Sequence, residues 1–268
     1  MYGTRRPMTR TEASAGRGAR HSGELREGGR TLVETAYERL RLGILHGDFE
    51  PGAKLRTEEL RARYNISGST VREALTRLLG ESLVTAEGQR GFRVAPISLD
   101  DFTDLTNVRK LLETETLRQS IAHGDDAWEA GVVGAYHRLS RVEEKLAEDP
   151  AAVSDEWEER NREFHQALAA ACPSRWLDRL SATMYQQSER YRRIAVSLRT
   201  VPRDVHAEHK AILEATLNRD ADLACRLLAE HINRTLAVIT RIMSERRPDE
   251  RRCANARAKG LAKATDLA

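Results

Sequence analysis

Apolar residues recur at helical spacing along most of this chain, and the alternation typical of strands is confined to one short region. The first helical stretches are predicted at about residues 31–47, 57–64 and 67–79, with short polar turns between them. After Gly80 the pattern changes, because "LVTAEGQRGFRVAP" holds two short β-prone runs around glycines. The sequence therefore predicts three helices followed by a β-hairpin over residues 31–96.

The third of these helices begins with the small polar run "SGST", and an apolar stripe follows it. The stripe can hold the helix against its domain while Arg72 stays on the open side. Free N–H groups at a helix start favour a phosphate, and small hydroxyl side chains let the backbone approach a duplex. By itself the helix could equally be an N-capped surface helix with a solvated arginine. The hairpin directly after it completes the order of a winged helix-turn-helix, which favours DNA binding.

From residue 97 onward the pattern is helical throughout, and no strand is predicted. The helical stretches are expected at about residues 99–122, 125–148, 151–171, 174–198, 203–218 and 220–245. Their lengths suit an antiparallel bundle. The predicted fold class is therefore mainly α, with a winged helix-turn-helix at 31–96 and an all-helical domain of about six helices at 97–245.

The charge of the 268-residue chain is unevenly distributed. Residues 1–30 carry seven Arg against three Glu, and residues 245–268 carry seven basic against four acidic residues. The formal net charge is only +3, so the middle of the chain is acidic. Both ends lack apolar periodicity, and we expect residues 1–30 and 246–268 to be disordered basic tails. They could contact nucleic-acid phosphates non-specifically or simply be solvated.

Three cysteines, Cys172, Cys225 and Cys253, show no metal-binding or disulfide spacing, which is typical of reduced thiols. The chain also lacks an apolar run long enough to span a bilayer. We therefore expect a cytoplasmic protein without a membrane partner.

Several motifs resemble one known family. The stretch "PGAKLRTEELRARYNISGSTVREALTRLLGESLV" with "GFRVAP" resembles the DNA-binding domain of the GntR family of bacterial regulators. The motifs "VRKLLE", "NREFHQAL", "EHKAIL" and "AEHI" resemble the FadR-like branch, which carries a helical FCD effector-binding domain. The resemblance covers about residues 31–244 and implies a ligand-responsive regulator, most often a repressor. One short recognition helix reads too few bases for specificity, so a homodimer on an inverted-repeat operator is expected.

The resemblance also implies which residues contact DNA: the start of the recognition helix, the arginine after it and the tip of the wing. On this chain those positions are Ser67, Ser69, Thr70, Arg72 and Arg90. Gly68 departs from the family pattern, since many members carry an arginine there. A glycine cannot make the bidentate contact that arginine makes to guanine, so the operator is expected to differ at that position.

Three histidines in the helical half are predicted to face inward. Asn161 and His165 share one helix face, while His209 and His231 lie on two consecutive helices joined by a tight turn. Singly, each histidine is more often a core residue than a ligand. Together they offer three imidazole nitrogens and one oxygen, a donor set that suits Zn, Ni, Mn or Fe. The resemblance implies a divalent-metal site of one aspartate and three histidines, from which the asparagine at 161 departs.

The resemblance further implies that a small organic acid binds at the metal. Arg109 could clamp its carboxylate, or it could form an i,i+4 surface pair with Glu113. Arg190 and Arg193 are further candidates for effector binding. Two alternatives remain open: a metal-free pocket for a larger acyl ligand, and a metallohydrolase. Against an enzyme, the sequence places no general base beside the histidines as HExxH motifs do, so no catalytic residue is predicted.

Overall fold

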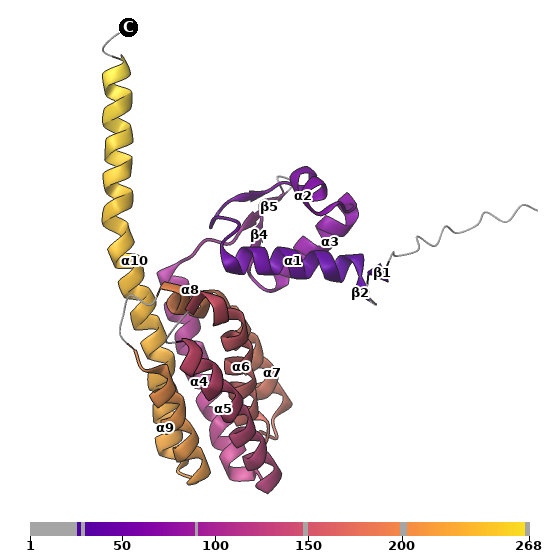
Figure 1. The fold of residues 1–268 in the computed structure, drawn as a ribbon, viewed down its shortest axis with the longest axis vertical. Coiled ribbons are helices and arrows are strands. Elements are labelled where there is room, and N and C mark those ends of the chain that lie inside the picture. The colour runs from indigo at the N-terminus through magenta and orange to yellow at the C-terminus, as the bar shows by residue number, and fades with distance from the viewer. Residues whose placement is uncertain (1–25, 28–29, 89–90, 147–149, 199–202, 266–268) are drawn as a thin grey trace, which may run out of the picture.

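The computed structural model describes residues 26–27, 30–88, 91–146, 150–198 and 203–265. Within these ranges an N-terminal unit of short helices and strands lies at one end of a bundle of longer helices (Figure 1). The mainly helical class predicted from the sequence is confirmed. No helix in these ranges is both long enough and apolar enough to cross a membrane.

The N-terminal unit has the helix order that the sequence predicts. Its helices are α1 (Leu32–His46), α2 (Thr57–Tyr64) and α3 (Gly68–Gly80). A capping box starts α1, because the Thr31 side chain accepts from the Glu34 N–H and Glu34 accepts from the Thr31 N–H. Gly47 ends α1 with a φ of 85°, a left-handed conformation that glycine adopts without strain.

A three-stranded antiparallel sheet completes this unit. It consists of β3 (Lys54–Leu55), β4 (Val84–Ala86) and β5 (Phe92–Val94) in the order β3-β5-β4. The predicted hairpin is β4–β5, paired with Val84 opposite Val94. The sequence did not predict β3, because two residues are too short to show alternation. The stripes of α1 and α3 form the core of the unit with Leu55, Val84 and Val94.

Seven helices in the described part of the chain form the bundle. They are α4 (Leu99–His123), α5 (Asp126–Leu146), α6 (Pro150–Ala169), α7 (Arg175–Gln187), α8 (Glu189–Leu198), α9 (Val205–Leu217) and α10 (Ala221–Thr265). The sequence predicts one helix over 174–198, but the structure breaks it at Ser188, where α7 ends. The Ser188 hydroxyl donates to the Tyr185 carbonyl at 2.7 Å, which satisfies a carbonyl at the end of α7.

Near both ends of the chain, the structure has secondary structure in segments that the sequence predicted to be disordered tails. Residues 1–25 lie outside the described residues, whereas Arg26–Glu27 and Arg30–Thr31 pair as the short strands β1 and β2. At the other end α10 continues to Thr265, past the limit of about residue 245 that the apolar periodicity predicts. This segment is rich in Ala, Arg and Lys, which favour a helix even without an apolar stripe.

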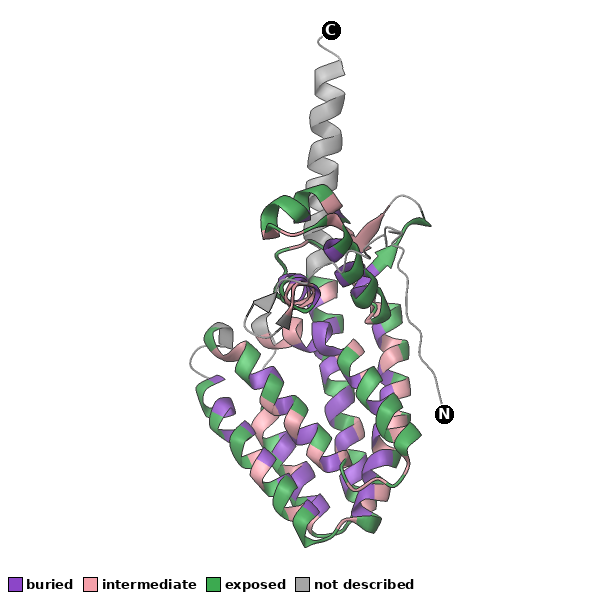
Figure 2. Cartoon of the chain, turned by 90° about the vertical axis from the view of Figure 1, so that its right-hand side faces the viewer, coloured by how far each residue is buried: buried purple, intermediate pink, exposed green. Residues whose placement is uncertain are grey.

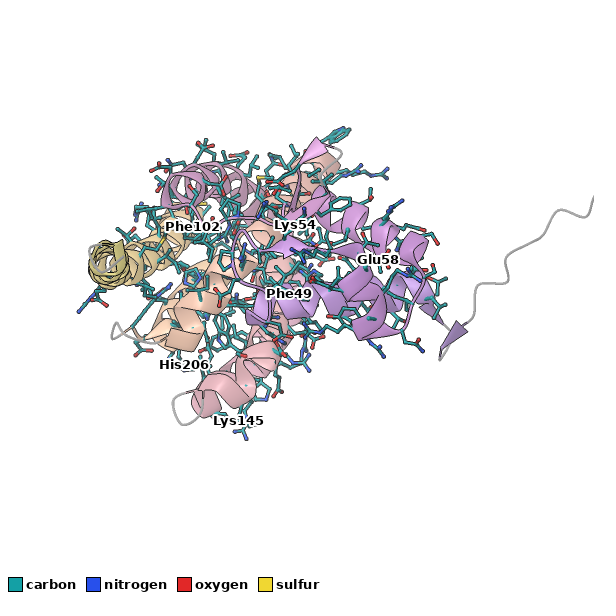
Figure 3. All side chains as sticks on the ribbon, turned by 90° about the horizontal axis from the view of Figure 1, so that it is seen from above. Phe49, Lys54, Glu58, Phe102, Lys145 and His206 are labelled. Atoms are coloured by element: carbon teal, nitrogen blue, oxygen red, sulfur yellow. The ribbon has the colours of Figure 1, made fainter. Side chains whose placement is uncertain are left out.

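Buried and exposed residues alternate along each bundle helix, and the buried positions face the bundle interior (Figure 2). A second, smaller apolar cluster lies where the bundle meets the N-terminal unit. Its centre is Phe102 of α4, labelled in Figure 3, which is fully buried. The Phe102 ring stacks on Tyr191 of α8 with the ring centroids 4.0 Å apart. This contact fixes the start of the bundle against α8.

Candidate metal centre and DNA-binding surface

The start of α3 is held by hydroxyl groups. Ser67 is the N-cap, and its side chain accepts from the Thr70 N–H at 3.1 Å. The hydroxyl oxygens of Ser69 and Thr70 each lie 2.8 Å from the Ser67 hydroxyl oxygen. Ser67 and Ser69 are exposed, whereas Thr70 is buried. The cluster therefore fixes the first turn of α3 and leaves two hydroxyl groups at the surface.

Arg72 is exposed on the same helix and forms no ion pair with another described residue. By contrast, Arg77 further along α3 pairs with Glu73 at 3.3 Å. A Cβ added at Gly68 would lie 3.3 Å from Cδ of Arg61, so a larger side chain requires that flexible arginine to shift. Arg90, predicted at the tip of the wing, lies outside the described residues.

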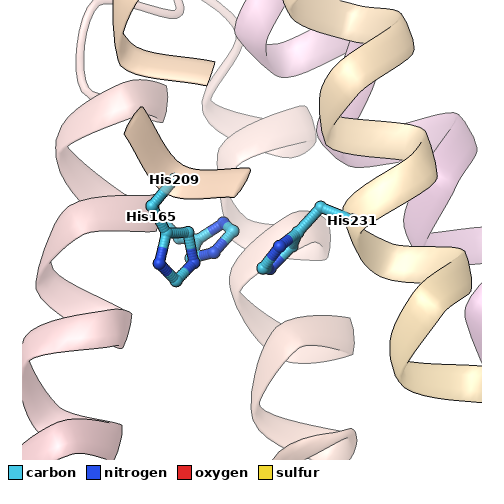
Figure 4. A group of neighbouring side chains, drawn as sticks. All are labelled: His165, His209 and His231. Carbon is cyan, nitrogen blue, oxygen red and sulfur yellow. The ribbon is translucent and has the colours of Figure 1, made fainter. Parts of the chain in front are cut away.

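The three predicted histidines lie together inside the bundle (Figure 4). His165 comes from α6, His209 from α9 and His231 from α10. One ligand atom from each lies within 4.8 Å of the others, and all three residues are buried. Three nitrogens at this mutual distance can surround one metal ion. The three histidines, which the sequence predicts to face inward on separate helices, thus lie close together in the structure.

Glutamate carboxylates fix the orientation of two of the three imidazole rings. Nδ1 of His209 lies 2.7 Å from Glu143 of α5, and Nδ1 of His231 lies 2.9 Å from Glu208 of α9. A carboxylate at Nδ1 fixes the tautomer that carries its proton there and leaves the lone pair on Nε2. Arg203 in turn holds Glu208 at 2.6 Å. The imidazoles are thus oriented as metal ligands require.

The site also favours the neutral form of two of the imidazoles, His165 and His231. Burial lowers the pKa of His165, and the nearby His231 and His209 lower it further. Burial lowers the pKa of His231 to about 3, although its hydrogen bond to Glu208 acts in the opposite direction. A neutral imidazole has the free lone pair that a metal ion needs, so these rings can coordinate at neutral pH.

Unsatisfied polar atoms collect at the predicted ligands. Among the described residues, three buried side-chain atoms there have no hydrogen-bond partner: Oδ1 of Asn161, Nε2 of His165 and Nε2 of His209. Nδ2 of Asn161 donates to the Tyr185 hydroxyl at 2.6 Å, which leaves its oxygen free. Buried polar atoms without a partner are costly and are uncommon in folded proteins. The residues therefore fit a bound divalent ion.

Two buried arginines lie on either side of Tyr185 beside this cluster. Arg109 pairs with Glu113 at 2.6 Å, the i,i+4 pair that the sequence suggested, but the pair is buried and not on the surface. The Arg109 guanidinium lies 5.2 Å from the centre of the Tyr185 ring, and that of Arg192 lies 3.8 Å from it. Arg192 also forms a buried ion pair with Glu158.

The other two predicted effector ligands, Arg190 and Arg193, both lie on α8. Arg190 donates to the Ala95 carbonyl at 2.6 Å, just after the wing, and so contacts the N-terminal unit. Arg193 pairs with Glu189 at 2.9 Å and also contacts Asp155. Arg192 lies between them in the sequence and was not predicted. Like Arg193, it lines the large cavity beside the histidines.

A cavity of 710 Å³ extends from this cluster toward the N-terminal unit. His165, Tyr185 and Arg192 line one part of it, and Tyr37 and Arg41 of α1 line another. A second, much smaller cavity of 50 Å³ is lined by Trp157, Asn161, Arg192 and His231. The indole nitrogen of Trp157 is buried there without a partner. Of the predicted ligands, His165 thus borders the larger cavity, and Asn161 and His231 border the smaller one.

Comparison with known proteins agrees with both halves of the structure. The family "Bacterial regulatory proteins, gntR family" matches residues 32–94, and the FCD domain matches residues 104–234. Over 210 residues the chain is 45% identical to the HTH-type transcriptional regulator BphR of Paraburkholderia xenovorans strain LB400, which covers 78% of this chain and 86% of that protein. The chain belongs to the GntR family. It is thus a DNA-binding transcription regulator with an FCD domain.

Other GntR relatives extend the comparison. The chain is 33% identical over 213 residues to the HTH-type transcriptional repressor GlaR of Escherichia coli strain K12, covering 78% of this chain and 96% of that protein. The crystal structure of a transcriptional regulator GntR from Rhodococcus sp. RHA1 superposes with a TM-score of 0.58 at 25% identity, covering 78% and 97% of the two chains. Another solved structure, E. coli McbR/YncC, shares the fold with a TM-score of 0.63 at 18% identity, covering 80% and 99%.

GntR regulators are in general not enzymes, but one argument against a hydrolase needs correction. The sequence showed no carboxylate placed beside the histidines, whereas the structure brings Glu143 and Glu208 within hydrogen-bonding distance of them. Glu208 precedes His209 in the chain, and Glu143 lies on the same helix face as Leu139 and Val142. A charged residue within an apolar stripe is the signal that could have identified Glu143. Both carboxylates contact Nδ1, on the opposite side of the ring from Nε2.

Proposed function

We propose that this GntR regulator is a repressor that binds an inverted-repeat operator as a homodimer. Its FCD domain holds a divalent metal ion through Asn161, His165, His209 and His231, and an organic acid binds at that ion. The observation that carries this proposal is the convergence of three buried histidines from three helices, with unpartnered donor atoms on Asn161, His165 and His209. The repressor GlaR, a relative at 33% identity, supports the direction of regulation.

The asparagine at 161 has a consequence for the effector. Four neutral ligands leave the full charge of a divalent ion in place, whereas an aspartate would cancel part of it. An anion is therefore attracted more strongly to this site. Arg109 and Arg192, the buried arginines beside the histidines, are both engaged by glutamates, so at the histidines themselves an entering carboxylate would be attracted mainly by the metal ion.

An apolar surface supports the homodimer. Leu111 of α4 is 73% exposed, and Trp176 of α7 is 70% exposed. Leu180 of α7 is also an exposed large apolar residue, and α4 packs against α7. Large apolar side chains that are exposed on two packed helices can form a protein–protein contact. A second copy of the chain is the partner that an inverted-repeat operator requires.

Metal analysis of protein purified without a histidine tag tests the metal site directly. We expect about one divalent ion per chain in the wild type and a loss of that ion in His165→Ala. An Arg138→Met variant serves as the control, because Arg138 lies at the surface and pairs with Glu163. A metal-free wild type that still binds an acyl ligand and the operator would instead support the metal-free alternative, which the size of the 710 Å³ cavity favours.

A further inference from the structure

The cavity beside the histidines has walls from both domains. Tyr37, Arg41 and Leu42 of α1 line it together with His165 and Arg192 of the FCD domain. Its volume of 710 Å³ lies in the range of roughly 300–1,000 Å³ that is typical of pockets for drug-sized ligands. A carboxylate that coordinates a metal ion at the histidines would fill only one part of this space. A longer ligand in the same cavity would reach the DNA-binding domain itself.

Arg41 lies where the two domains meet. Its Nε donates to Glu81 of the DNA-binding domain at 2.9 Å, and one of its terminal nitrogens forms an ion pair with Glu189 of the FCD domain. The Arg41 side chain is 19% exposed, so this shared contact is partly shielded from water. Glu189 is also held by Arg193, which contacts Asp155. His46 of α1 pairs with the same Asp155 at 2.9 Å.

Helix α8 connects this contact to the metal centre. Glu189 is its first residue, and three positions later Arg192 stacks on Tyr185 and pairs with Glu158. The Tyr185 hydroxyl accepts from Asn161, a predicted metal ligand. Between Glu189 and Arg192 on the same helix, Arg190 donates to the carbonyl of Ala95, which follows the wing. One helix of ten residues thus contacts the ligand cavity, the DNA-binding domain and the link between the domains.

We propose that the effector is an elongated molecule with an acidic group at each end, and that its second group binds Arg41 and displaces Glu189. One acidic group coordinates the metal ion at the histidines, which rests on the proposed function. The other forms the bidentate contact that a guanidinium offers to a carboxylate. The Arg41–Glu189 contact then holds the DNA-binding domain in place only while the cavity is empty. Ligand binding releases that domain and weakens operator binding, as a repressor requires.

The holding contact can be tested without a ligand, in the full-length protein loaded with Zn²⁺. We expect Arg41→Met and Glu189→Gln each to lower operator affinity by roughly 5- to 150-fold, the range of typical allosteric couplings. The double variant should be no weaker than the stronger single variant, because both changes remove one contact. Arg138→Met, which removes a surface pair within the FCD domain, should bind the operator like the wild type. Wild-type operator affinity in both Arg41→Met and Glu189→Gln would overturn the proposal.

The ligand class is tested with a series of straight-chain dicarboxylates of three to eight carbons and the monocarboxylates of matching length. Calorimetry of the Zn²⁺-loaded wild type should show an optimum chain length and a preference of about tenfold or more for the dicarboxylate, the gain of one charge-assisted contact. Arg41→Met should lose that preference and keep both its metal and its monocarboxylate affinity. No dicarboxylate preference in the wild type overturns the ligand class. Failure of the wild type to bind metal would instead contradict the proposed function.

Discussion

His209→Ala tests whether the histidine cluster is a metal site, because it removes one Nε2 donor and leaves the other two in place. His209 is fully buried, and Glu143 holds its Nδ1 at 2.7 Å. The metal-free variant is expected to be less stable by about 1–3 kcal/mol, since Glu143 loses a buried hydrogen-bond partner. Stability alone therefore cannot identify a ligand. The informative quantity is how stability responds to free metal ion.

The response follows from the linkage between binding and folding. A ligand that binds only the folded state adds about 1.4 kcal/mol for each tenfold increase in its free concentration above the dissociation constant. For a chain with ~200 ordered residues, that raises the melting temperature by roughly 3–6 °C per tenfold. Thermal unfolding, followed by circular dichroism across a buffered Zn²⁺ series, measures this slope. The wild type should show it, and His209→Ala should be nearly flat.

His206→Ala is the matched control. His206 also contacts Glu143, at 3.1 Å, but its side chain is 44% exposed and it is not a predicted ligand. It should lose some stability and keep the wild-type slope. If His209→Ala retains the full slope, or if His206→Ala loses it equally, His209 does not bind metal and the cluster is a group of core histidines.

The DNA-binding surface, the tails and the dimer give further predictions. Arg72→Ala should lose about 1–3 kcal/mol of operator affinity in a gel-shift titration if Arg72 contacts a base edge, and unchanged affinity would exclude the contact. Gly68→Arg should shift the consensus selected from a random DNA library toward a guanine-containing site, whereas an identical consensus would show that Gly68 does not shape specificity. Deleting residues 1–25 and 248–268 should lower non-specific DNA affinity and flatten its salt dependence, and an unchanged slope would mean that the tails do not contact DNA. Leu111→Arg should yield monomers in sedimentation equilibrium and weaken operator binding, and a stable dimer would place the interface elsewhere.

Sequence periodicity predicted most helices of this chain, because most of them carry an apolar stripe, but it missed the C-terminal part of α10, which lacks one. It also predicted the histidine cluster, since His165, His209 and His231 each lie within such a stripe. Periodicity could not predict the break at Ser188, because the apolar pattern of α7 continues into α8 without an interruption. Arg192, which lines the large cavity next to Arg193, was not among the predicted effector ligands.

Side-chain pairs between residues far apart in the chain could not be predicted from the sequence either. Glu143 and His209 are 66 positions apart, and Arg41 and Glu189 are 148 apart. Each of these residues reads as an ordinary charged or polar side chain until the packing of the helices brings it to its partner. The Arg109–Glu113 pair shows the opposite case. Its i,i+4 spacing was visible in the sequence, but its burial depends on α7 covering that face of α4.

Trp157 gives this regulator an intrinsic spectroscopic reporter. The indole lines the small cavity together with Asn161 and His231, whereas Trp176 is mostly exposed and Trp128 donates its indole N–H to the Ala167 carbonyl. Fluorescence from a buried indole is emitted at shorter wavelength than fluorescence from an exposed one, so the two populations can be separated by wavelength. A paramagnetic ion such as Ni²⁺ at the histidines would quench the indole beside it more strongly than the exposed one. The occupancy of the proposed metal centre could therefore be followed by tryptophan fluorescence in the unlabelled protein, while it is bound to DNA.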